Sequence, residues 1–241
     1  MKKFWLSEKM LANAFWNALE CSAMIGDAKS DAKLVASKTS PLVKKFPSIA
    51  GSISLDSSFY LWLVTKYFSP SNICEIGTYI GRSTLIMALA SADSLKLLST
   101  CDGTFDCLDL TSFKKISSSD QKNKSVEKIR YFGKTMSTDM LKTLREDKIN
   151  IDFVFIDGRI SNNDCEILRE ITTKDAILLI DDFEGVEKGV MNAMMLRTFF
   201  PNYLLLEPPI IGGRRDRLNL AVLIPSSIIN VSRQQSLPVE M

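Results

Sequence analysis

The spacing of apolar residues divides the chain into two parts. In residues 1–27, apolar side chains recur at every fourth position, including Leu11, Phe15 and Leu19. This period predicts an amphipathic helix. From residue 72 onward, short apolar runs alternate with segments of helical spacing, which is the pattern of a sheet whose strands are connected by helices.

Seven of the apolar runs have the length of β-strands. We expect strands at 72–76, 95–100, 128–132, 151–156, 176–180, 203–207 and 218–224. We expect helices through 59–67 and at 82–92, 139–147, 163–171 and 185–200. The run Phe153–Ile156 does not alternate with polar residues, and such runs are typical of strands buried on both faces of a parallel sheet.

The last two predicted strands are joined by a short loop that leaves no room for a crossover helix, so they are expected to pair antiparallel. The predicted fold class is therefore α/β. We expect a Rossmann-like three-layer sandwich with a seven-stranded, mostly parallel sheet and a C-terminal antiparallel pair. The predicted boundaries are a helical extension at 1–50, the domain at 51–230 and a tail at 231–241.

Composition and charge narrow the range of partners. The chain is 46% apolar and 24% charged, with a net charge of +2, so nothing indicates nucleic acid or an anionic membrane as partner. No apolar run approaches the roughly 20 residues that span a bilayer. The five cysteines show no CxxC spacing, which is typical of reduced thiols in a cytoplasmic protein. A small molecule is the expected partner, and the aromatic-rich N-terminal helix suggests a homodimer.

The chain contains no histidine. This excludes the commonest general base and zinc ligand, together with every Ser-His or Cys-His nucleophile. A base must then be a carboxylate, a lysine, a tyrosine or a water molecule, and a metal must be held by oxygen or sulfur.

Gly77 and Gly81 lie where the strand at 72–76 turns into a helix. Glycine accepts positive φ and allows a ligand to approach the backbone, and the helix N-terminus favours negative groups. Tyr79 stands where dinucleotide-binding enzymes carry the middle glycine of G-x-G-x-x-G. A tight turn that binds nothing is the alternative interpretation of the two glycines.

Two carboxylates favour a ligand at this loop. Glu75 ends a strand that is expected to be buried, where an unpaired charge is costly. Asp102 ends the next strand along the chain. In nucleotide-binding sheets, a carboxylate at that place accepts hydrogen bonds from ribose hydroxyls.

The segment 73–84, which reads ICEIGTYIGRST, resembles the first motif of class I S-adenosylmethionine (SAM)-dependent methyltransferases. The resemblance is strongest to the catechol/caffeoyl-CoA O-methyltransferase-like and methyltransferase 24 groups, and it extends over about 56–225. It implies SAM as the cofactor. The cofactor-binding residues that it implies are Glu75, Gly77, Thr78, Tyr79, Gly81, Ser83, Asp102, Gly133, Thr135 and Asp157.

Further carboxylates are predicted to meet at one edge of the sheet, because Asp157, Asp181 and Asp182 all follow buried parallel strands. Side by side they would repel one another unless they are protonated or neutralised, and Mg²⁺ is a cation that prefers oxygen ligands. The resemblance also places them on the metal positions of metal-dependent O-methyltransferases. Helix capping by these residues is the alternative.

The resemblance breaks at the base. Metal-dependent relatives usually carry a lysine three residues after the first Asp, where this chain has Ile160. The candidate catalytic residues are Asp157 and Lys134, with Tyr79 as a further candidate base.

The favoured function is SAM-dependent O-methyl transfer to a small molecule, an activity of the EC 2.1.1 class, with assistance by Mg²⁺ or another divalent cation. One alternative is a non-catalytic SAM- or nucleotide-binding protein. The other is a different enzyme on the same scaffold, such as a hydroxylase-related tailoring enzyme.

Overall fold

The computed structural model of the chain describes residues 8–25, 53–111, 124–183, 186–207 and 219–228. The strands are β1 (Asn72–Ile76), β2 (Leu97–Asp102), β3 (Ile129–Gly133), β4 (Ile151–Ile156), β5 (Thr172–Ile180), β6 (Tyr203–Leu206) and β7 (Ala221–Pro225). The helices are α1 (Glu8–Ile25), α3 (Leu55–Phe68), α4 (Arg82–Ala90), α6 (Ser137–Glu146), α7 (Asn162–Ile171) and α8 (Met191–Phe199), with a 3₁₀ turn η1 (Lys124–Lys128) and a π-helical turn η2 (Val186–Val190). The seven predicted strands are thus confirmed, with their ends shifted by a few residues.

The strands form one sheet in the order β3-β2-β1-β4-β5-β7-β6. β1 to β5 run parallel to one another. β7 is inserted between β5 and β6 and runs antiparallel to both. The prediction of a parallel sheet with a C-terminal antiparallel pair is therefore confirmed.

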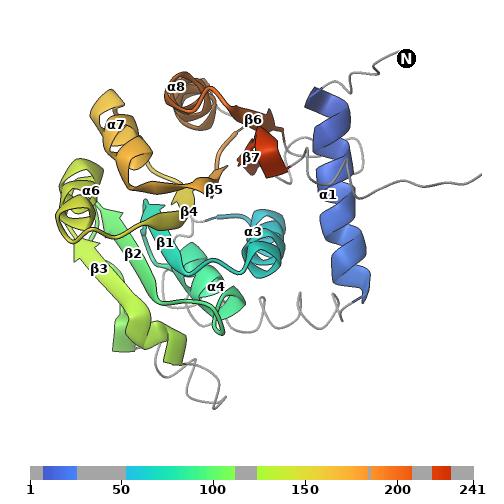
Figure 1. Cartoon of the computed structure of the whole chain (residues 1–241). Coiled ribbons are helices and arrows are strands. Elements are labelled where there is room, and N and C mark those ends of the chain that lie inside the picture. Colours follow the sequence, from blue (N-terminus) through green and yellow to red (C-terminus); the bar gives the residue numbers. More distant parts are fainter. Residues whose placement is uncertain (1–7, 26–52, 112–123, 184–185, 208–218, 229–241) are drawn as a thin grey trace, which may run out of the picture.

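Both faces of the sheet are buried, as the non-alternating runs predicted. In β4, Phe153 and Phe155 pack into one hydrophobic cluster together with residues of α3 and α4. Val154 and Ile156 pack into a second cluster, together with residues of α6, α7 and α8. Figure 1 shows these two sets of helices on opposite faces of the sheet, which gives the three-layer sandwich.

The N-terminal helix α1 packs on the domain of its own chain. Trp16 is buried in the same cluster as α3, and its Nε1 donates a hydrogen bond of 2.7 Å to the backbone oxygen of Glu207, just after β6. Figure 1 shows α1 beside the β6–β7 end of the sheet. The homodimer stays a prediction, as do the domain boundaries, and the predicted tail at 231–241 lies outside the described residues.

Within the described part of the chain, no helix combines the length and the apolar character needed to cross a membrane.

Candidate active site

The loop between β1 and α4 has the backbone conformation that its glycines predicted. The φ angles of Gly77 and Gly81 are 101° and 79°, and that of Tyr79 is 45°. A Cβ atom on Gly77 would lie 2.7 Å from the backbone nitrogen of Gly158. Gly77 is therefore needed both for its backbone angle and for the close approach of the loops after β1 and β4.

Glu75 is fully buried below this loop. Its Oε1 accepts a hydrogen bond of 2.5 Å from Ser83 Oγ, and its Oε2 accepts one of 2.5 Å from Thr84 Oγ1. Burial raises the pKa of Glu75 to about 7, although the hydroxyl groups that bond to it act in the opposite direction. Glu75 and Ser83, both predicted to bind the cofactor, thus contact each other and tie the end of β1 to the first turn of α4.

Asp102, at the end of β2, organises the backbone around it. Its Oδ2 accepts a hydrogen bond of 2.8 Å from the backbone N–H of Tyr79. Its Oδ1 accepts bonds from the backbone N–H groups of Thr104 and Phe105, at 2.9 and 2.8 Å. A carboxylate oxygen has two lone pairs, so Oδ2 keeps one acceptor position with respect to the described residues. Asp102 thus holds the glycine loop and the turn after β2 together and retains hydrogen-bonding capacity.

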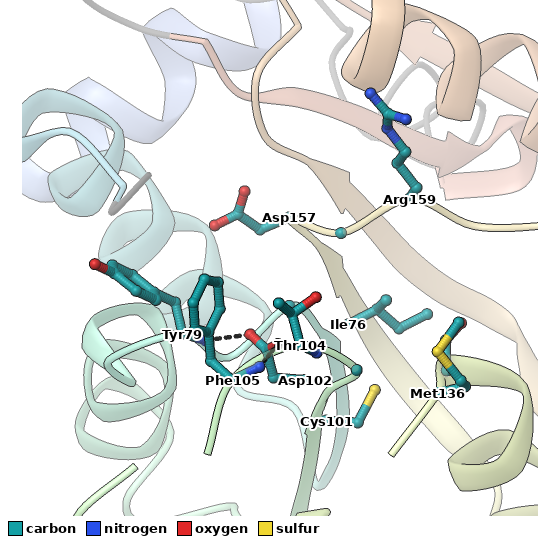
Figure 2. Close-up of a pocket in the computed structure, with 13 residues that line it drawn as sticks. Ile76, Tyr79, Cys101, Asp102, Thr104, Phe105, Met136, Asp157 and Arg159 are labelled. Atoms are coloured by element: carbon teal, nitrogen blue, oxygen red, sulfur yellow. Dashed lines mark hydrogen bonds between the residues drawn. The ribbon is translucent and has the colours of Figure 1, made fainter. Parts of the chain in front are cut away.

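A cavity of about 450 Å³ opens at the carboxyl ends of β1, β2 and β4 (Figure 2). Its lining consists of Ile76, Gly77, Tyr79, Cys101, Asp102, Gly103, Thr104, Phe105, Met136, Ser137, Asp157, Gly158 and Arg159. The Tyr79 and Phe105 rings meet edge to face, with centroids 5.2 Å apart. In Figure 2, Asp157 and Arg159 lie across the opening from Asp102 and Cys101. The volume is in the range of small-molecule sites, and the lining combines apolar surface with two carboxylates.

The cavity brings together only some of the predicted site residues. Gly77, Tyr79, Asp102 and Asp157 line it. The remaining predicted cofactor-binding residues, outside the lining, are Glu75, Thr78, Gly81, Ser83, Gly133 and Thr135. Lys134, a predicted catalytic residue, is exposed on the turn after β3 and is not part of the lining either.

The predicted acidic cluster is present, but a lysine is bound to it. Lys188, from η2, places its Nζ 2.5 Å from Asp157 Oδ1 and 2.6 Å from Asp182 Oδ2. Asp181, the third predicted carboxylate, is buried. The sequence predicted the three carboxylates at one edge but not the ammonium group between two of them.

Burial is the main cause of the raised pKa values of two carboxyl groups in this cluster. It raises the pKa of Asp157 to about 6, although Lys188 acts in the opposite direction. It also raises the pKa of Asp181 well above its ordinary value, and the nearby charges of Asp157 and Asp182 add to that effect. Burial lowers the pKa of Lys188, but the two carboxylates outweigh it and the net pKa is raised. Lys188 is therefore a cation at neutral pH.

These residues, as they are arranged, do not fit a divalent cation. Lys188 already occupies the space between Asp157 and Asp182, and a metal ion placed there would face a positive charge at contact distance. Among the described residues, no group of three or more His, Cys, Asp or Glu side chains is arranged to hold a metal ion.

Sequence reasoning did not assign a role to several residues of the site. Phe105 lines the cavity, although it lies in a segment that carries no motif. Lys188 is separated from Asp157 by 31 positions, and nothing in its local sequence distinguishes it from a solvated lysine. Only the sheet topology, which brings the elements after β4 and β5 side by side, connects the two.

The segment that contains most of the cavity lining matches a known family. Residues 74–183 match the model of the methyltransferase 24 family, which describes a methyltransferase domain. The chain carries a methyltransferase domain. The matched segment runs from within β1 to just beyond β5 and contains Asp102, Asp157, Asp181 and Asp182. The resemblance of the glycine loop to class I methyltransferases is thereby confirmed.

Solved structures show the same fold as this methyltransferase domain. One is the methyltransferase PaMTH1 of Podospora anserina bound to S-adenosylhomocysteine (SAH), with 16% identity and a TM-score of 0.57 over 93% of this chain and 99% of that one. Another is an O-methyltransferase from Bacillus cereus in complex with SAH, with 17% identity and a TM-score of 0.54 over 81% of this chain and 90% of that one. A third is the O-methyltransferase TomG of Streptomyces achromogenes in complex with SAM, with 16% identity and a TM-score of 0.52 over 81% of this chain and 89% of that one. The chain matches no curated protein.

Proposed function

We propose that this methyltransferase domain binds SAM in the cavity at the carboxyl ends of β1, β2 and β4 and methylates a hydroxyl oxygen of a small molecule. The main support for this proposal is the position of Asp102. Its carboxylate joins the glycine loop to the turn after β2, lines the cavity and keeps one acceptor position on Oδ2. That is the arrangement a ribose hydroxyl requires.

The rest of the lining suits the same ligand. Tyr79 and Phe105 offer aromatic surface beside Asp102, and Met136 offers apolar surface across the cavity. Asp157 supplies a negative charge for a cationic or amino group. When it is bound, SAM supplies the methyl group. The three named neighbours, whose structures contain SAH or SAM, support this choice of ligand.

The role that we propose for Asp157 is to take the proton that the acceptor hydroxyl loses. Its carboxylate lines the cavity, and Lys188 binds Oδ1. With respect to the described residues, Oδ2 remains available to the acceptor. Lys134, the other candidate, is exposed on the turn after β3. The remaining task of the site is alignment, because methyl transfer depends mainly on the approach of the two reacting atoms.

A second candidate is transfer assisted by Mg²⁺ or another divalent cation, which the convergence of Asp157, Asp181 and Asp182 favours. This version requires Lys188 to leave the two carboxylates that it now bridges. The bridged arrangement therefore favours the version without metal.

Methyl-labelled SAM tests the proposal. We expect label in an ether product when the protein is incubated with SAM and a panel of phenols and aliphatic alcohols, and none with amines alone. The variant Asp157→Asn should lower kcat at saturating SAM by at least about tenfold. Loss of the negative charge should also weaken SAH binding, and saturation with SAM separates the two effects. Asp139→Asn, at an exposed carboxylate on α6, is the matched control and should leave both unchanged.

Two results would contradict the proposal in different ways. Tight SAH binding without label transfer to any hydroxyl acceptor would favour the non-catalytic SAM-binding protein. Thermal stabilisation by NAD but not by SAM or SAH would favour a different enzyme on the same scaffold.

A further inference from the structure

We infer that Lys188 is the built-in cation of this active site: its ammonium group occupies the place between Asp157 and Asp182 where a divalent cation would otherwise bind. The inference rests on the proposed function at one point only, because it makes methyl transfer independent of metal. The position of Lys188 between the two carboxylates does not depend on that function. It assigns Lys188 as a positioning residue, which acts through the two carboxylates.

The first support is the geometry of the bridge. Lys188 Nζ lies within hydrogen-bonding distance of one oxygen from each carboxylate, and the two carboxylates come from the ends of neighbouring strands, β4 and β5. The side chains of Lys188 and Asp157 are only 25% and 11% exposed, so water screens this pair weakly. Asp182, at 45% exposure, forms the outer side of the bridge.

The second support is that the fold holds Lys188 at this position. The next residue, Gly189, lies directly on the end of β5: a Cβ atom there would be 2.4 Å from the backbone oxygen of Asp182 and 2.6 Å from that of Asp181. Only glycine allows η2 to approach the strand end so closely. Asp182 itself has a φ of 55°, an uncommon angle for a residue other than glycine.

The third support is a tie between the helix that follows Lys188 and the loop that follows Asp157. Asn192, in the first turn of α8, is buried and donates a hydrogen bond of 2.8 Å from Nδ2 to the backbone oxygen of Gly158. Asn192 Oδ1 also accepts a hydrogen bond of 3.4 Å from the backbone N–H of Ile160. The segments that carry the lysine and the inner carboxylate are thus joined both by charge and by hydrogen bonds. Lys188 is not a surface lysine that reaches the site by chance.

The consequence for the site is charge balance without metal. Two carboxylates close together need a positive charge between them, and an oxygen-rich acidic pair attracts a divalent cation when none is present. An ammonium group offers three N–H donors, and the two carboxylates take two of them. Removal of that ammonium should therefore expose a site for a hard divalent cation.

Binding of Mn²⁺, followed by electron paramagnetic resonance, tests the proposed role of Lys188. The measurement does not require that the protein transfers methyl groups. We expect the wild-type protein to bind no Mn²⁺ at submillimolar concentration, and its SAH affinity to be unchanged by EDTA. Lys188→Ala and Lys188→Gln should each bind one Mn²⁺ at least about tenfold more tightly than wild type. A second change, Asp157→Asn, should remove that gain.

Lys142→Ala is the matched control, because it removes a lysine from an exposed pair with Asp139 on α6 and should gain no Mn²⁺ binding. The inference is overturned if wild type already binds Mn²⁺ in a way that depends on Asp157, or if neither Lys188 variant gains affinity. The wild-type measurement decides the first point even if a variant does not fold. Failure of SAH binding would count against the proposed function and would leave the Mn²⁺ result valid.

Discussion

The two sides of the cavity are built by different means. On the β1–β2 side, the backbone makes the site: positive φ angles at Gly77 and Gly81 shape the loop, and Asp102 gathers backbone N–H groups. On the β4 side, side-chain charge contributes: Asp157 lines the cavity, and Lys188 holds it together with Asp182, which lies outside the lining. The first kind of construction is local in sequence and leaves a motif. The second depends on a partner that only the folded chain brings near.

The largest effect on stability and SAH binding is expected on the β1–β2 side of the cavity. Gly77→Ala should lower the free energy of unfolding by about 4 kcal/mol and abolish detectable SAH binding, because the added methyl group meets the loop after β4 at an unfavourable φ. Chemical denaturation and calorimetric titration with SAH measure the two effects.

Gly103→Ala provides the comparison within the same cavity. The added Cβ would lie 2.8 Å from the Sδ atom of Met136, whose side chain is exposed and able to move. We expect a loss of stability below about 1 kcal/mol. Equal losses for the two variants would show that backbone geometry does not distinguish Gly77.

The next effect concerns the buried carboxylate below the loop. The pKa of Glu75 is raised from 4.5 to about 7, so the folded state holds the proton more tightly than the unfolded state does. The stability that this group contributes is fully present below pH 4.5 and is lost as the pH rises through about 7, a change of about 3 kcal/mol.

Urea denaturation of wild type and Glu75→Gln at pH 4.5 and pH 8 measures this contribution. The difference in stability between wild type and the variant should fall by about that amount from the lower to the higher pH. Parallel pH profiles for the two proteins would contradict a raised pKa at Glu75.

The contrast between local backbone geometry and contacts made only by the folded chain also explains what could be predicted from the sequence. The strands and the conformations of Gly77 and Gly81 follow from apolar runs and glycine positions, which act locally. The convergence of Asp157 and Asp182 was predicted from their places at the carboxyl ends of parallel strands, and β4 and β5 are neighbours in the sheet. The lysine between them was not predicted, because η2 reaches the strand end only through the close packing of Gly189.

A smaller effect on stability is expected at the bridge that Lys188 forms with Asp157 and Asp182. Lys188→Ala should lower the free energy of unfolding by about 2 kcal/mol, because it leaves a largely buried carboxylate, Asp157, without its cation. The partly exposed Asp182 keeps this below the loss expected for a fully buried pair. Thermal and urea denaturation at neutral pH measure the loss, and Lys188→Arg should recover part of it. A loss as small as that of a surface ion pair would show that the bridge is screened by solvent.

The smallest effect belongs to an exposed ion pair far from the site. Arg145 and Glu170 are 3.1 Å apart, with side chains about half exposed. Arg145→Ala should change the free energy of unfolding by less than about 0.5 kcal/mol, because water screens the pair. A loss near 2 kcal/mol in the same denaturation assay would remove the contrast with Lys188.

Calorimetric titration of the wild-type protein and Asp102→Asn with SAH and with NAD measures whether Asp102 and the glycine loop form a SAM site. We expect SAH to bind wild type with a stoichiometry of one and NAD not to bind. Asp102→Asn should bind SAH at least about tenfold more weakly, since one carboxylate oxygen is replaced by an amide group. Binding of NAD in place of SAH, or equal SAH affinity of the two proteins, would contradict it.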